Sequence, residues 1–263
     1  MINEKEHGFR DKKGHFVPHN AAEKNPIWIL PLNLKKIFNW FLFSYIFTWN
    51  LVYLIITLLA FIYLTPNLSV MKNLSIDWIS LILLRNYIIV IIFFSLIHLP
   101  LYVSKRQGIK FKFNPMWPEK KQKLFTFNRQ ILDNLFWSLC WGVPIWTAYE
   151  VLSFWFYASG YIPLLNFSEN PIYFIFLILL IPLLRDAHFY LVHRLLHFKF
   201  FYNIAHKIHH RNLNPGPWSS LSMHPVEHVL YFSGVIIHWL ILSHPIHAMY
   251  HIFHAGLGSA NGH

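Results

Sequence analysis

Long apolar runs separated by short polar links dominate the first two thirds of the chain. No charged residue occurs from Ile37 to Leu64, and about 20 apolar residues suffice to cross a bilayer core roughly 30 Å thick. A second run extends from Trp78 to Val103 and contains Arg85. A charge inside a membrane is costly, so we expect Arg85 to snorkel or to pair with a neighbouring helix. These two runs predict two membrane-spanning helices.

Two further apolar runs predict the return crossings. The run from Leu132 to Tyr157 contains Pro144, which favours a kinked helix, and Glu150, which we expect to face the bundle interior. The run from Pro171 to Leu184 is short for a span, but its helix can lengthen through the residues that follow. The pattern predicts an all-α fold, an integral membrane bundle of about four transmembrane helices.

The polar segments predict the organisation and orientation of this bundle. Residues 1–36 are predicted to be a polar, mobile cytoplasmic arm, residues 37–184 the membrane region, and residues 185–263 a histidine-rich cap. The loop at 104–130 carries many lysines and arginines against a single acid, Glu119. The positive-inside rule places this loop, the amino terminus and the cap on the cytoplasmic side.

Histidines recur after the apolar runs at spacings typical of metal sites. Fourteen of the 18 histidines lie from His188 onward, and seven of these lie in the sequences HRLLH, HKIHH and HPVEH. The candidate ligands from these three boxes and from just before them are His188, His193, His197, His206, His209, His210, His224 and His228.

Helical spacing predicts that several of these imidazoles converge. Residues three, four, seven and eleven apart share one face of a helix, so Asp186, Tyr190, His193 and His197 form one stripe. The HKIHH histidines form a second stripe, and the segment FKFFYN between them is long enough for a turn that makes the stripes face each other.

A cluster of this kind predicts a metal site without choosing the metal. Imidazole nitrogen is a good ligand for iron, zinc, copper or nickel. Neutral imidazoles leave the charge of a divalent ion uncompensated, so Asp186 and Glu227 are predicted to offset it or to orient the ligand rings from behind, and Tyr190 is predicted to support the site with them.

Composition agrees with a membrane protein and excludes other classes. The chain is 55% hydrophobic, 19% aromatic and only 13% charged. Its formal charge of +11 comes from basic residues that flank apolar runs, so we expect no nucleic-acid partner. The single cysteine, Cys140, excludes a disulfide framework within the chain and a multi-cysteine metal site, and its apolar surroundings predict a packed, inert thiol.

The ordered boxes resemble those of the fatty acid hydroxylase superfamily, which includes sterol desaturases, sterol methyl oxidases and ceramide or fatty acid hydroxylases. The matching pattern is HRxxH, then HxxHH, then HP followed by an acidic residue, and the resemblance spans roughly residues 182–263. It implies an integral membrane protein with a histidine-bound pair of iron ions. The ligands that it implies are His193, His197, His206, His209 and His210, with His188, His224, His228 and His263 as weaker transfers. The family continues to a last HxxHH box, so the resemblance also implies that this chain is truncated.

The resemblance implies hydroxylation or desaturation of a lipid with O2. A sterol, a carotenoid, a fatty acyl chain and a sphingoid base remain open as substrates. The sequence contains no nucleotide-binding fingerprint, so electrons are expected from a carrier such as cytochrome b5 or ferredoxin. The basic loop could steer an acidic carrier, or it could only set the topology.

Other readings of the histidines also have testable consequences. HPVEH has the spacing of inverted zincins, in which His224 and His228 would bind zinc beside Glu227 as the general base of a membrane hydrolase. A haem protein or a non-enzymatic metal-binding membrane protein are further alternatives. The later stripe of His247, His251 and His254 could extend the metal site or line the substrate path.

Overall fold

The structure is a computed structural model that describes residues 7–12, 16–19, 25–112 and 114–261. Helices make up nearly all of its regular structure, which confirms the all-α prediction. The exception is a small antiparallel hairpin of β1 (Gly8–Arg10) and β2 (Phe16–Pro18).

Three helical segments are long and apolar enough to cross a membrane. They are Leu34–Leu64, Ile76–Val103 and Pro171–Leu196, and in each only 17 to 33% of the most apolar window is buried. The exposed remainder is apolar and needs a lipid environment. The chain is therefore an integral membrane protein. The segments comprise α1 (Leu34–Asn39), α2 (Trp49–Leu64), α3 (Ile76–His98) with its extension Leu99–Val103, and α6 (Pro171–Leu196).

The fourth expected span is helical but is not among these three segments. It consists of α4 (Gln130–Trp137), a π-helical turn at Ser138–Gly142 and α5 (Val143–Ala158). Glu150 of α5 forms a buried ion pair with Arg85 of α3, and Asn86 Nδ2 donates to the other oxygen of Glu150 over 2.8 Å. Both predictions are confirmed, that Arg85 pairs with a neighbouring helix and that Glu150 faces the interior.

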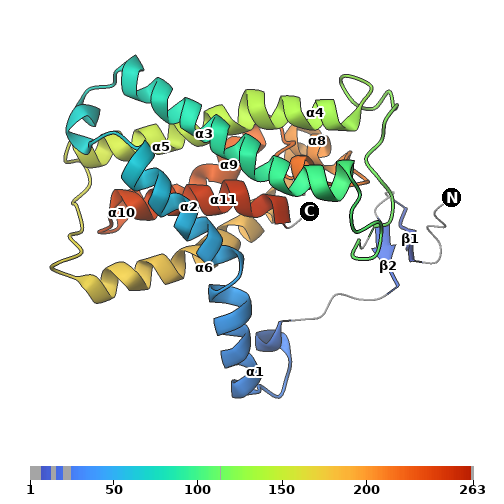
Figure 1. The fold of residues 1–263 in the computed structure, drawn as a ribbon, viewed down its shortest axis with the longest axis horizontal. Helices are drawn as coiled ribbons and strands as arrows, with labels where there is room; N and C mark the ends of the chain where they lie inside the picture. Colours follow the sequence, from blue (N-terminus) through green and yellow to red (C-terminus); the bar gives the residue numbers. More distant parts are fainter. Residues whose placement is uncertain (1–6, 13–15, 20–24, 113, 262–263) are drawn as a thin grey trace.

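The centre of the bundle is α11 (Pro245–Gly258), which packs against α2, α3, α5 and α6 (Figure 1). Every residue from Pro245 to Leu257 is buried. The fully buried ring of Trp146 in α5 meets Phe253 of α11 at 5.1 Å between centroids. His244 caps the first turn of α11.

Short helices between α6 and α11 carry the remaining histidine boxes. They are α7 (Lys199–Phe201), a π-helical turn at Tyr202–His206, α8 (Lys207–His210), α9 (Pro225–Phe232) and α10 (Ile237–Leu240). Pro225 occupies the first turn of α9, as the HPVEH sequence predicts.

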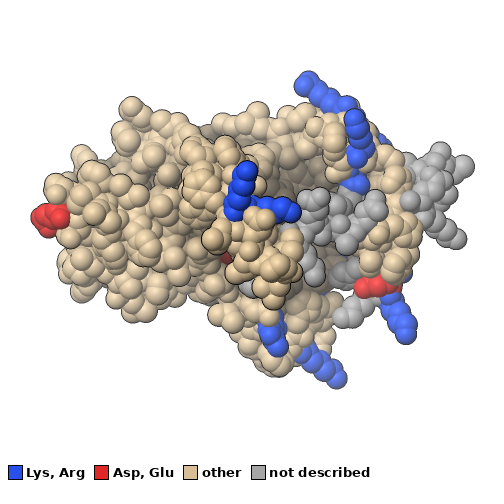
Figure 2. All heavy atoms as spheres, turned by 90° about the horizontal axis from the view of Figure 1, so that it is seen from below, with Lys and Arg blue, Asp and Glu red and all other residues tan. Residues whose placement is uncertain are grey.

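The described part of the amino-terminal arm contacts the loop before α9: the Arg10 guanidinium donates to Asn214 Oδ1 over 2.7 Å and to the carbonyl of Leu213 over 3.3 Å. The prediction of a mobile cytoplasmic arm at residues 1–36 stays a prediction. The expectation of a packed Cys140 is wrong. Cys140 is exposed and not packed. It lies on the outer side of the π-helical turn, where an apolar environment would be lipid and not the protein core. Figure 2 shows that much of one face carries no charged side chain and that most of the visible lysines and arginines lie toward one end.

Candidate metal centre

Four imidazoles from two helical segments converge on one point. His193 and His197 lie one turn apart at the end of α6, and His206 and His210 lie one turn apart across the π-helical turn and α8. One ligand nitrogen from each of the four lies within 4.8 Å of all the others. The two stripes predicted from the spacing therefore face each other, because the extended residue Phe198 separates α6 from α7 and breaks the helical path between them.

The nitrogen separations fit ligands of a single ion. The Nε2 atoms of His193 and His197 are 3.1 Å apart, and those of His206 and His210 are 2.9 Å apart. Two nitrogens that each lie about 2.1 Å from one ion are about 3.0 Å apart at a right angle and about 3.4 Å apart at the tetrahedral angle. Both pairs therefore suit adjacent positions of a right-angled coordination sphere with room for further ligands.

Glu227 of α9 supports this group from behind. The Nδ1 atom of His206 donates to Glu227 Oε1 over 2.8 Å, and the side chains are 0% and 3% exposed. A carboxylate in this position fixes the tautomer of the imidazole and leaves Nε2 free to bind an ion. Burial raises the pKa of Glu227, and the hydrogen bond from His206 opposes that rise. The second oxygen, Oε2, is buried without a hydrogen-bond partner among the described residues.

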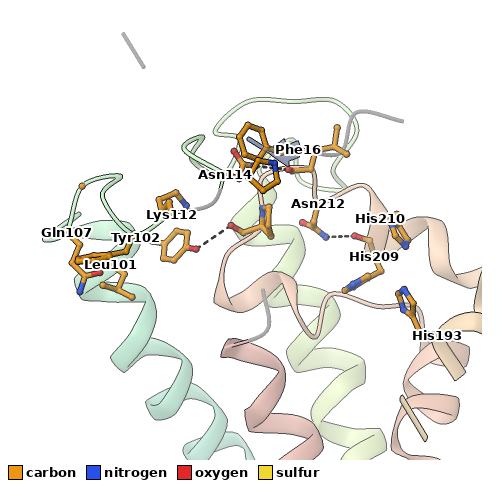
Figure 3. A pocket seen from close by; sticks show the side chains of 15 residues that line it. Phe16, Leu101, Tyr102, Gln107, Lys112, Asn114, His193, His209, His210 and Asn212 are labelled. Carbon is orange, nitrogen blue, oxygen red and sulfur yellow. Dashed lines mark hydrogen bonds between the residues drawn. The ribbon is translucent and has the colours of Figure 1, made fainter. Parts of the chain in front are cut away.

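His209 lies beside the four-histidine group without belonging to it. Its ring is stacked on that of His206 with 5.6 Å between centroids, and it lines a cavity together with His193 and His210 (Figure 3). The backbone around it is fixed, because the His209 carbonyl accepts hydrogen bonds from the Asn212 backbone and side-chain amides, each over 3.2 Å.

The other histidines proposed as ligands lie elsewhere. His188 Nε2 is 3.0 Å from Ser233 Oγ. His224 Nδ1 accepts from the Val226 amide over 3.3 Å and so caps α9. His263 lies outside the described residues.

His228 is occupied by a backbone contact. It is fully buried, and its Nε2 atom donates to the carbonyl of Leu221 over 3.1 Å. Burial lowers the pKa of His228 to about 3, so the ring is neutral. Since His224 serves as a cap and His228 as a backbone donor, the HPVEH residues do not converge in the way that a zinc hydrolase site requires.

Asp186 and Tyr190 also lie away from the four histidines. The Asp186 carboxylate, 62% exposed, accepts from Arg185 Nη1 over 2.9 Å. The Tyr190 hydroxyl accepts from Arg194 Nη1 over 2.9 Å. Of the three residues predicted to support the site, Glu227 is the one that contacts a histidine of the group.

The stripe on α11 forms its own buried contacts. His247 Nε2 donates to the carbonyl of Phe174 over 3.0 Å, and His254 Nε2 donates to Asn50 Oδ1 over 2.8 Å. His251 Nδ1 is 3.1 Å from Nε2 of His238. Burial lowers the pKa values of His251 and His254 to about 3. These side chains bridge helices as neutral imidazoles.

A cavity of about 590 Å³ lies against the four-histidine group. Its wall opposite the histidines comes from the end of the α3 extension and the basic loop, which contribute Leu101, Tyr102 and Lys112 (Figure 3). No periodic pattern in the sequence predicts this wall, because the loop from residue 104 onward has irregular backbone. The cavity places an apolar space of ligand size next to three of the histidines.

Comparison with known proteins concerns the carboxyl-terminal third of the chain. Residues 178–263 match the family model described as fatty acid hydroxylase. The C-4 methylsterol oxidase of Schizosaccharomyces pombe is 36% identical over 67 residues, which cover 24% of this chain and 22% of that protein. A Dictyostelium discoideum protein that carries the name methylsterol monooxygenase is 40% identical over 65 residues, which cover 25% of this chain and 24% of that protein. The chain thus spans less than a quarter of the length of these relatives. No solved structure matches the chain significantly.

Proposed function

The chain belongs, through residues 178–263, to the fatty acid hydroxylase superfamily, and we propose that the protein is a membrane-bound di-iron oxygenase. In this proposal it hydroxylates or desaturates a lipid with O2 and with electrons from an external carrier. The observation that carries the proposal is the group of four convergent imidazoles with a buried carboxylate behind it.

His193, His197, His206 and His210 would hold one iron. Their nitrogens already lie at separations suited to adjacent ligands, so little reorganisation is needed on binding. Glu227 keeps the His206 ring oriented and supplies negative charge beside a set of neutral ligands. Bound iron would supply the one-electron chemistry that oxidation of an unactivated C–H bond with O2 requires.

The second iron of the proposed pair would bind near His209, which lines the same cavity as His193 and His210. The predicted ligation by His188, His224, His228 and His263 stays a prediction. The role of the cavity is to hold the lipid against the histidines and to exclude water from the reacting carbon.

The basic loop and the histidine group lie at the same end of the bundle, because both contribute to one cavity. The positive-inside rule then favours a cytoplasmic active site, which suits a substrate taken from the bilayer. The lysines and arginines of this loop would also attract an acidic electron carrier such as cytochrome b5 or a ferredoxin.

Metal analysis of the purified full-length protein tests the proposal. Iron and zinc are measured per chain in detergent for the wild type and for His197→Ala and His224→Asn. Asparagine at position 224 removes an imidazole but keeps a helix cap. We expect two irons per chain in the wild type, loss of iron in His197→Ala and retention in His224→Asn. Oxygen uptake with a chemical reductant should follow the iron content.

One zinc ion per chain would contradict the proposal if the His197→Ala protein retains this zinc and the His224→Asn protein loses it. That result would favour the hydrolase reading of His224, Glu227 and His228. Metal at the four histidines without reductant-dependent oxygen uptake would instead favour a metal carrier.

A further inference from the structure

The cavity beside the metal-binding group contains one lysine among its described lining residues, Lys112. Apart from this residue and the histidines, the described lining residues are uncharged; they include apolar side chains such as Leu101 and Phe111 and the amides of Gln107, Asn114 and Asn212. Lys112 lies on the wall opposite His193 and His209 (Figure 3). The cavity therefore has a cationic end and a metal-binding end.

Aromatic rings hold the Lys112 ammonium without neutralising it. Its Nζ atom lies 4.5 Å from the ring centroid of Tyr102 and 4.8 Å from that of Trp117. No carboxylate of the described residues lies within ion-pair distance of Lys112. Cation–π contacts orient an ammonium group, but they leave its positive charge available for an anion.

A second ammonium lies on the same indole. Lys105 Nζ is 4.4 Å from the ring centroid of Trp117. Two like charges on one ring repel each other, and an anion between or beside them would relieve that repulsion. Burial lowers the pKa of Lys112, so this ammonium is already partly desolvated.

Lys112 contacts the end of a candidate membrane span, through the ring of Tyr102. Tyr102 belongs to the last turn of the candidate span Ile76–Val103, so its ring marks the end of the apolar helix. Tyrosine and lysine side chains are typical of the membrane interface, where headgroups lie. An acyl chain bound in the cavity would extend from there toward the histidines.

We propose that Lys112 binds the anionic headgroup of the substrate lipid, a carboxylate or a phosphate ester, and that the apolar chain of this lipid extends along the cavity to His193, His209 and His210. That the bound lipid is the substrate rests on the proposed function. The charge of Lys112 would favour an acidic lipid over neutral sterols and alcohols, because these carry no negative charge to pair with the ammonium group.

Binding of matched lipids to the full-length protein tests this inference. The probes are oleate, dioleoyl phosphatidate and oleyl alcohol, titrated into protein in a nonionic detergent. The variants are Lys112→Met, which keeps the length of the side chain, Lys112→Arg, which keeps its charge, and Lys110→Met. Lys110 is an exposed lysine of the same loop that does not line the cavity, so it serves as the control.

We expect Lys112→Met to weaken binding of at least one anionic lipid by about tenfold or more, as loss of a charge-assisted contact predicts. Oleyl alcohol should bind all variants alike, while Lys112→Arg and Lys110→Met should stay within about threefold of the wild type. A loss confined to oleate identifies a carboxylate, and a loss confined to phosphatidate identifies a phosphate ester.

Two results would overturn the inference. One is wild-type protein that binds oleyl alcohol as tightly as both anionic lipids, a comparison that needs no variant. The other is Lys112→Met protein that binds both anionic lipids like the wild type. Iron content is measured in the same samples. If the protein contains no iron but still prefers anionic lipids, the result counts against the oxygenase proposal and not against the lipid-binding inference.

Discussion

Replacing Glu227 by glutamine should move metal affinity and apo-protein stability in opposite directions. In the wild type the carboxylate accepts the Nδ1 hydrogen of His206 over 2.8 Å in a fully buried setting. Glutamine keeps the shape and can still accept this hydrogen through its carbonyl oxygen, but it removes the negative charge. Loss of a carboxylate behind a ligating imidazole typically costs 10- to 100-fold in metal affinity, or about 1.4 to 2.7 kcal/mol.

The apo protein should respond differently, because a buried charge is costly when no ion balances it. Burial raises the pKa of Glu227, so the folded protein already disfavours its charged form. Removing that charge should leave the apo protein as stable as the wild type or slightly more stable. Glu227→Ala should instead lower the stability by about 1 to 3 kcal/mol, since it leaves the Nδ1–H group of His206 buried without a partner.

The assay is anaerobic reloading of chelator-stripped protein with Fe²⁺ or Co²⁺ against a competing chelator, with thermal unfolding of the apo protein measured in the same detergent. A Glu227→Gln protein that binds the ion within twofold of the wild type would refute the contribution of the Glu227 charge to metal binding. A marked fall in the unfolding temperature of the apo Glu227→Gln protein would show that the carboxylate acts as a structural group instead.

Three further changes test the packing and the charges of the bundle. Gly256→Ala would place a Cβ atom 2.2 Å from the buried ring of Trp146 in α5 and should lower stability by about 1 to 3 kcal/mol. The control is Gly258→Ala, whose Cβ atom would lie 3.4 Å from its nearest atom. Thermal unfolding should show that this control is neutral or stabilising. Arg85→Met leaves Glu150 buried without its ion-pair partner and should lower the free energy of unfolding by about 3 to 5 kcal/mol. The double variant Arg85→Met/Glu150→Leu should recover most of this loss. Denaturant unfolding in detergent measures both values. His254, whose pKa burial lowers to about 3, binds no proton when folded at pH 5 but does so when unfolded. Its contribution to stability should therefore be full above pH 6.5 and fall by about 1.4 kcal/mol per pH unit below it, and His228 and His251 should each add a similar slope to the fall in unfolding temperature with pH.

The hydrophobic pattern predicted the membrane helices well, because lipid allows few solutions. A long uncharged run must form a helix that spans the bilayer, and three such segments follow the predicted runs closely. The pattern could not predict the contacts of the amino-terminal arm. That arm is polar and aperiodic, and within its described part the Arg10 guanidinium reaches the Asn214 side chain more than 200 residues away. Such a contact leaves no local periodic signal.

The histidine stripes show why spacing alone could not define the metal centre. His193 and His197 on α6 have the same helical spacing as His247 and His251 on α11, so the sequence treats the two pairs alike. The first pair faces two more imidazoles, and one nitrogen from each of the four rings lies within 4.8 Å of the other three. The second pair faces other groups, because His247 donates to the Phe174 carbonyl and His251 contacts His238.

The helix on the opposite side therefore decides whether a histidine joins the candidate metal site or forms a hydrogen bond between helices. Opposite His193 and His197, HKIHH brings further imidazoles into a group that could hold an ion. Opposite α11, a carbonyl and a single imidazole form hydrogen bonds between helices instead. HKIHH lies opposite α6, and its π-helical turn brings His206 and His210 onto the side that faces α6. The same geometry turns His209 toward the cavity, where an ion bound to the four histidines and a lipid held at Lys112 would approach each other.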